Sequence, residues 1–116
     1  MERKKLYEVE GECLIINLPE ELDHHTAKEI RNETDALFSS KKIRNVIFNY
    51  ENTSFMDSSG IGLVMGRYRE VRYLKGNIYL VGITDKMKRI LEISGLYRIA
   101  KRAMSVSDAL NDIYKN

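Results

Sequence analysis

Two short apolar runs with a helical stretch between them constrain the fold of this 116-residue chain more than any other feature. Residues 13–18 and 46–50 are rich in β-forming side chains, and about two dozen residues separate them. Strands joined by a helical crossover of this kind run parallel, because the helix returns the chain to the end of the sheet where the first strand began. The pattern therefore predicts an α/β fold with parallel strands.

The rest of the chain continues this alternation. Residues 5–10 form a weak strand, and the turn signal Gly11-Glu12 predicts an antiparallel hairpin with residues 13–18. Further strands are expected at 78–81 and, weakly, at 97–100. We predict a mixed sheet of four or five strands with about four helices mainly on one face. No linker or repeat divides residues 1–116, so one domain is expected.

Helical periodicity predicts where the helices start and what they bury. Asp23 and Thr26 are both candidate starts of the first helix, and Thr26 with Glu29 fits a capping box. The second helix should run from about Ser58 to Tyr73, the third from Thr84 to Gly95, and the last from Ser105 or Ser107. Each helix should bury one face. The residues expected on it are Ala27, Ile30, Thr34, Leu37 and Phe38 in the first helix, Ile61, Val64, Met65, Tyr68 and Val71 in the second, Met87, Ile90 and Leu91 in the third, and Val106, Leu110 and Ile113 in the last.

Composition excludes several classes of protein. The single cysteine, Cys13, permits no internal disulfide and fits a reducing compartment, where it should be a small buried side chain. The amino terminus lacks the apolar segment of a secretory signal, and no apolar run approaches the ~20 residues that cross a bilayer. A net charge of +2 without a dense basic tract argues against nucleic acid as the main partner. We expect a cytoplasmic protein that is not embedded in a membrane.

The segment 53–62, T-S-F-M-D-S-S-G-I-G, carries the most chemical information. It joins a predicted strand to a helix, so it lies at the carboxyl edge of the sheet, where α/β folds place their sites. Asp57, Ser58 or Ser59 can cap the helix, and Gly60 can allow close packing. A serine at a helix N-terminus is also a good phosphorylation site, because free N–H groups and the helix dipole tolerate a dianion.

Other chemistries fit the residues less well. The chain has no phosphate-binding loop of the form G-x-x-x-x-G-K-[ST] and no G-x-S-x-G elbow, and no cofactor is expected. The adjacent His24 and His25 point about 100° apart on a helix, which makes them poor joint metal ligands. A small esterase that uses Ser58, with one of these histidines as base, requires the fold to bring the two loops together. The loop 20–26 also leaves a strand and enters a helix, and can lie on the same edge as Ser58.

The run F-M-D-S-S-G-I-G at 55–62, followed by G-R-Y at 66–68, closely resembles the STAS-domain anti-sigma factor antagonists. The segments L-D-H-H-T-A at 22–27 and I-S-G-L at 93–96 support the resemblance, which extends from about residue 6 to residue 113 in the correct order. The likeness is greatest to the antagonists that act in sporulation. It implies a single STAS domain.

The resemblance implies a binding protein rather than an enzyme. The unphosphorylated antagonist is expected to bind an anti-sigma factor that is also a serine kinase, and so to release the sigma factor, here sigma-F. Phosphorylation on Ser58 would inactivate it, and a serine phosphatase would restore it. Asp23, Phe55, Met56, Asp57, Ser59 and Gly60 correspond to the partner-binding surface. We expect the free protein to be monomeric. A STAS regulator of a general-stress sigma pathway is the alternative.

Overall fold

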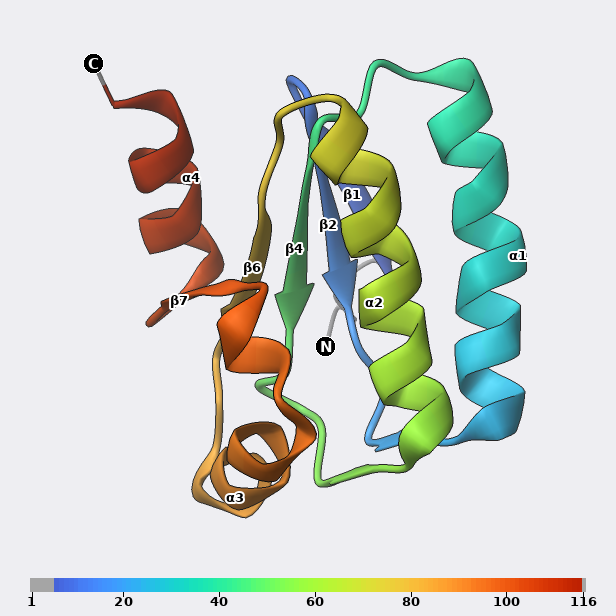
Figure 1. Ribbon diagram of the computed structural model, residues 1–116, viewed down its shortest axis with the longest axis vertical. Helices are drawn as coiled ribbons and strands as arrows, with labels where there is room; N and C mark the ends of the chain where they lie inside the picture. The colour runs from blue at the N-terminus through green and yellow to red at the C-terminus, as the bar shows by residue number, and fades with distance from the viewer. Residues whose placement is uncertain (1–5, 116) are drawn as a thin grey trace, which may run out of the picture.

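The computed structural model describes residues 6–115, which form one layered α/β unit (Figure 1). In chain order the elements are β1 (Tyr7–Glu10), β2 (Cys13–Asn17), β3 (Glu21–Leu22), α1 (His24–Ser40), β4 (Asn45–Asn49), β5 (Phe55–Met56), α2 (Ser58–Tyr73), β6 (Ile78–Val81), α3 (Asp85–Ser94), the 3-10 helix η1 (Leu96–Arg98), β7 (Lys101–Ala103) and α4 (Val106–Tyr114).

The main sheet has five strands in the order β1-β2-β4-β6-β7. β1 pairs antiparallel with β2, and all other neighbours are parallel. The hairpin and the parallel crossovers expected from the sequence are thus confirmed. Lys5, which was assigned to the first strand, lies outside the described residues.

Side chains alternate between the two faces of the sheet. Leu14, Phe48 and Leu80 point to the larger core, which α1 and α2 cover on that face. Ile15, Ile47 and Tyr79 point to the opposite face, where Ala109 of α4 packs on them. α3 lies beyond the carboxyl ends of the strands (Figure 1). The first turns of α1 and α2 are at that same end, so the carboxyl edge of the sheet gathers most of the loops.

The helices match the prediction closely, with two corrections at the level of residues. The capping box of α1 is formed by Asp23 and Thr26, so Thr26 is inside the helix and does not cap it with Glu29. On α2, Met65 is 40% exposed, whereas Leu63 and Arg67 are buried. The helix is rotated relative to the predicted stripe because its buried face also contacts α1, through Arg67.

The weak last strand was predicted at 97–100 and is found at 101–103 instead. Gly95 adopts the left-handed conformation with a φ of 83°, which ends α3 and lets the chain enter η1 directly. Residues 96–98 are therefore helical, and the strand begins only after Ala100. Its partner is β6, in parallel.

Candidate functional site

Two loops meet at the carboxyl edge of the sheet and form a second, two-stranded sheet. The loops leave β2 and β4, which are parallel neighbours, and pair as β3 and β5 with Leu22 opposite Met56. The backbone N–H of Ser54 donates to the carbonyl of Glu20 at 2.8 Å, and that of Asp57 donates to Leu22 at 3.2 Å. The loop around Asp23 and the loop around Ser58 therefore form one surface. Both had been expected to be plain loops.

An aspartate caps the helix that follows each loop. The Asp57 carboxylate accepts a hydrogen bond from the backbone N–H of Ser59 at 2.8 Å at the start of α2. The Asp23 carboxylate accepts from the backbone N–H of Thr26 at 3.0 Å at the start of α1. The hydrogen bonds from Thr26 lower the pKa of Asp23 below its ordinary value. Of the three candidate caps at 57–59, Asp57 has this role.

Ser58 and Ser59 face different surroundings. Ser58 is the first residue of α2 and is exposed, and its hydroxyl makes no hydrogen bond to any residue from 6 to 115. Ser59 is half-buried, and its hydroxyl lies 3.3 Å from Nδ1 of His24. Of the two hydroxyls, only that of Ser58 is accessible to an external group without breaking a contact.

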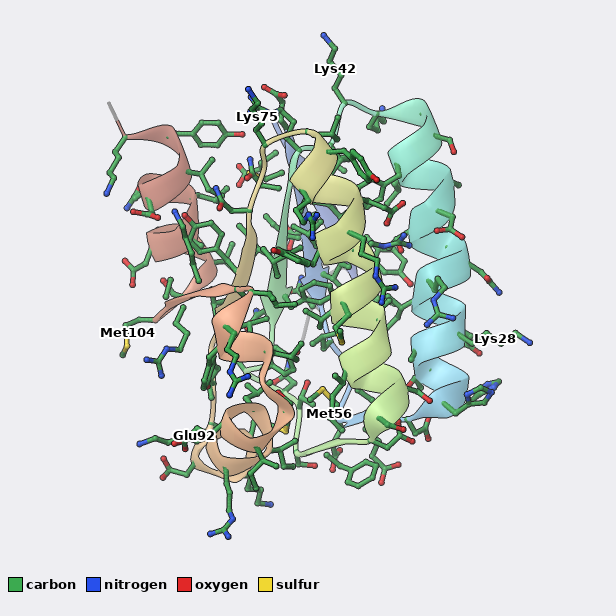
Figure 2. All side chains as sticks on the ribbon, in the orientation of Figure 1. Lys28, Lys42, Met56, Lys75, Glu92 and Met104 are labelled. Atoms are coloured by element: carbon green, nitrogen blue, oxygen red, sulfur yellow. The ribbon has the colours of Figure 1, made fainter. Side chains whose placement is uncertain are left out.

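Phe55 and Met56 divide between surface and core. The Phe55 side chain is 45% exposed, whereas Met56 is 4% exposed and accepts a weak hydrogen bond at Sδ from the Tyr50 hydroxyl at 3.9 Å. Figure 2 shows Met56 beside the first turn of α2. Phe55 is therefore the member of the pair on the accessible surface, and Met56 belongs to the core.

Gly60 fits closely under the small sheet. A Cβ atom at this position would lie 2.4 Å from Cγ of Met56 and 2.9 Å from Cδ2 of Leu22, both too short for a real contact. Gly60 is buried, so its part in the site is to let α2 approach β3 and β5. This spacing fixes where Ser58 is presented.

The site lacks the arrangement expected of a hydrolase. The fold does bring the His24 loop to the serine loop, but the ring contacts Ser59 and not Ser58. Within residues 6–115, no group of three or more His, Cys, Asp or Glu residues is placed to hold a metal ion. No helix of the described chain is both long enough and apolar enough to span a bilayer.

Comparison with known proteins identifies the class. The family model of the STAS domain matches residues 4–109. The anti-sigma F factor antagonist of Lysinibacillus sphaericus is 40% identical over 88 residues, which cover 76% of this chain and 75% of that protein. The chain belongs to the STAS-domain family, among the anti-sigma factor antagonists, which are regulatory rather than catalytic proteins.

Solved structures of the anti-sigma factor antagonist SpoIIAA resemble this chain over nearly its whole length. The structure of unphosphorylated SpoIIAA superimposes with a TM-score of 0.76 at 29% identity, covering 95% of this chain and 97% of the other. The phosphorylated form of SpoIIAA from Bacillus gives a TM-score of 0.72 at 34% identity, covering 92% and 96%. This chain is thus an anti-sigma factor antagonist of the SpoIIAA type.

Proposed function

We propose that this chain, acting as one STAS module over residues 1–116, is a cytoplasmic partner-switching protein controlled at Ser58. Unphosphorylated, it binds an anti-sigma factor that is also a serine kinase, and the bound sigma factor, sigma-F of sporulation, is released. The kinase phosphorylates Ser58 and ends the interaction, and a serine phosphatase removes the phosphate. The observation that carries this proposal is the exposed hydroxyl of Ser58 at the start of α2, which makes no hydrogen bond within the part of the chain that the structure describes.

The position of Ser58 supports a switch that leaves the fold intact. Within residues 6–115 the hydroxyl makes no hydrogen bond that a phosphate would break, and a helix N-terminus tolerates negative charge. The phosphate adds about two negative charges beside Asp57. A partner surface that accepts a neutral hydroxyl next to one carboxylate would then meet a strongly anionic cluster, and like charges would weaken binding.

The partner-binding surface in this proposal is the edge formed by the two loops. Its members are Asp23, Phe55, Met56, Asp57, Ser59 and Gly60. Phe55 supplies exposed apolar area, and buried aromatic side chains often dominate the energy of an interface. Met56 and Gly60 contribute from beneath, because they set the position of the loop. Asp23 and Asp57, with the exposed Glu20 and Glu21, make this edge acidic and favour a basic partner surface.

The direct test is phosphorylation by the kinase and ATP followed by mass spectrometry. Wild-type protein and Ser59→Ala should gain one phosphate, and Ser58→Ala should gain none while still binding the kinase. Ser58→Asp should fold normally and bind weakly in a calorimetric titration. Phosphate found mainly on Ser59 or Ser54, or full binding by Ser58→Asp, would refute the switch.

The involvement of the Asp23 loop can be tested through kinetics. Since Asp23 is a half-buried carboxylate within the proposed interface, removing its charge should slow association with the kinase at low salt. An unchanged association rate for Asp23→Asn would exclude this loop from the interface.

A general-stress sigma pathway is the alternative function, and the identity of the kinase that binds this chain distinguishes the two pathways. Incubation with a generic ester tests the esterase hypothesis, which predicts turnover that Ser58→Ala abolishes.

A further inference from the structure

The end of the molecule opposite Ser58 carries a compact group of exposed cations and apolar side chains, here called the basic tip. Figure 2 shows Lys42 and Lys75 at this end, and Met56 near the other. The tip consists of the turn after α1 and the end of α2, with the residues Lys41, Lys42, Arg44, Arg72, Tyr73, Leu74 and Lys75, all of them exposed.

Four of the five cations of the tip lack an anionic partner within the described chain. Lys41, Lys42, Arg72 and Lys75 form no ion pair with any residue from 6 to 115, and Arg44 is 3.9 Å from its nearest carboxylate, that of Glu12. Exposed cations gathered on one surface attract an anionic partner. The acidic edge around Ser58 lies at the other end, so such a partner would not cover it.

Two apolar side chains stand among these cations. Tyr73 and Leu74 are adjacent at the end of α2, and their side chains are 89% and 47% exposed. Leu74 lines a hollow of about 410 Å³ together with Phe38 and Ile43. The other residues around this hollow are three cations, Lys41, Lys42 and Arg44, and one carboxylate, Glu12. An exposed aromatic next to lysines is the arrangement that proteins use at the interface between water and lipid.

The backbone holds the tip in a fixed shape. The Arg44 guanidinium donates to the carbonyl of Leu74 at 3.1 Å, and Gly76 allows the close approach of the Arg44 carbonyl, which would collide with any Cβ there. α2 ends with the N–H of Gly76 bonded to the carbonyl of Val71. In this helix ending the preceding residue takes the left-handed conformation and is usually glycine.

Here that residue is Lys75, with a φ of 58°, and it is the one non-glycine residue in the described chain with a positive φ. A lysine at this position is strained relative to glycine, so stability of the helix end does not account for it. The charge that Lys75 adds to the tip gives a reason for a lysine at this position. The left-handed backbone of Lys75 thus supports a role for this lysine separately from the exposure of the other cations.

We propose that the basic tip binds the surface of an anionic phospholipid membrane. The cations contact lipid phosphates, and Tyr73 and Leu74 enter the headgroup region. The protein lies on the membrane without crossing it, and the acidic edge with Ser58 faces away from the bilayer. A membrane is favoured over an acidic peptide because Tyr73 projects into solvent, whereas a peptide site would enclose its anchor in a groove.

Sedimentation with lipid vesicles tests the proposal. Wild-type protein should bind vesicles of phosphatidylcholine with about one third phosphatidylglycerol, should release them as salt is raised, and should not bind phosphatidylcholine alone. Lys75→Gly and Lys42→Gln should each lower the affinity about fivefold. Tyr73→Ser should lower the affinity with little change in its salt dependence.

Two controls separate binding from folding and from net charge. Lys75→Gly should have an unfolding midpoint equal to or above that of the wild type, since glycine relieves the left-handed strain. Lys28→Gln removes an equal charge from the exposed face of α1, and should leave vesicle binding unchanged. The proposal is overturned if wild-type protein binds neither vesicle or both equally, or if Lys28→Gln weakens binding as much as Lys75→Gly. Binding to polyglutamate without binding to anionic vesicles would assign the tip to an acidic protein instead.

Discussion

The Nδ1 atom of His24 lies 3.3 Å from the hydroxyl oxygen of Ser59, and this contact joins the first turn of α1 to the first turn of α2. Ser59 adjoins Ser58, so the contact orients the turn that presents Ser58, the residue we propose as the switch. His25, the other histidine, turns away and pairs with Glu29 on the exposed face of α1 at 2.8 Å.

A double-mutant cycle measures this contact. His24→Ala and Ser59→Ala should each reduce the free energy of unfolding slightly, and the double variant should lose less than the sum of the two. A coupling of about 0.5–1 kcal/mol is expected for an exposed hydrogen bond. His25→Ala combined with Ser59→Ala is the matched control and should be additive. Full additivity for His24 and Ser59 would mean that the contact does not persist in solution.

Two glycines of α2, Gly60 and Gly62, give a matched pair of substitutions that tests the packing of this helix. Gly60→Ala should destabilise the protein by about 1–3 kcal/mol, because the new methyl group would collide with Met56 and Leu22. Gly62→Ala, one half-turn away with open space around it, should stabilise the helix by about 0.5–1 kcal/mol. Urea denaturation of both variants gives the comparison. Equal effects of the two substitutions would contradict the close packing under the small sheet.

Phe55→Ala and Met56→Ala should affect different properties: the first should weaken binding, and the second should reduce stability. Met56 is buried between α2 and β3, so its truncation should cost about 2–5 kcal/mol of stability. Phe55 is exposed, so its truncation should leave the melting temperature nearly unchanged and weaken binding to the anti-sigma factor. Thermal unfolding and calorimetric titration of each variant test the division. If Phe55→Ala bound normally, the aromatic side chain would be excluded as an anchor.

Asp23 should make stability depend on pH in acid. Hydrogen bonds from Thr26 lower the pKa of this carboxyl in the folded protein. Its charged form therefore favours folding above the ordinary aspartate pKa of about 3.9, and this contribution is lost as pH falls through the lower folded value. Asp23→Asn keeps a competent helix cap without the charge. The difference in melting temperature between wild type and Asp23→Asn should shrink between about pH 5 and pH 2; a constant difference would contradict the assignment.

Most of the framework could be predicted because its signals are local. The helix at 58–73 and the strand at 78–81 were predicted within their observed bounds, since Gly76-Asn77 separates a helical stripe from an apolar run. β3 and β5 could not be predicted, because two residues are too few to show a period of two. They pair only because β2 and β4 are parallel neighbours that deliver both loops to one edge.

Arg67 shows a second limit of sequence reasoning. A charged residue on a helix is expected in solvent, yet its side chain is buried between α1 and α2. It donates to the carbonyl of Arg31 and to the carboxylate of Asp35, both at 2.9 Å, and its guanidinium stacks over Phe38. Arg31 and Asp35 each lie more than thirty residues away from Arg67 in sequence. Only the packing of the two helices brings them together.

The position of α4 limits how the protein can be shortened. In the described chain, α4 alone covers the second face of the sheet, where Ile15, Ile47 and Tyr79 are buried. A fragment ending at Met104 would retain every residue of the Ser58 edge but would open this apolar face to water. Such a fragment would self-associate through the uncovered sheet. Any loss of recognition after truncation would therefore report exposure of this apolar face, and the proposed switch should be studied with the last helix in place.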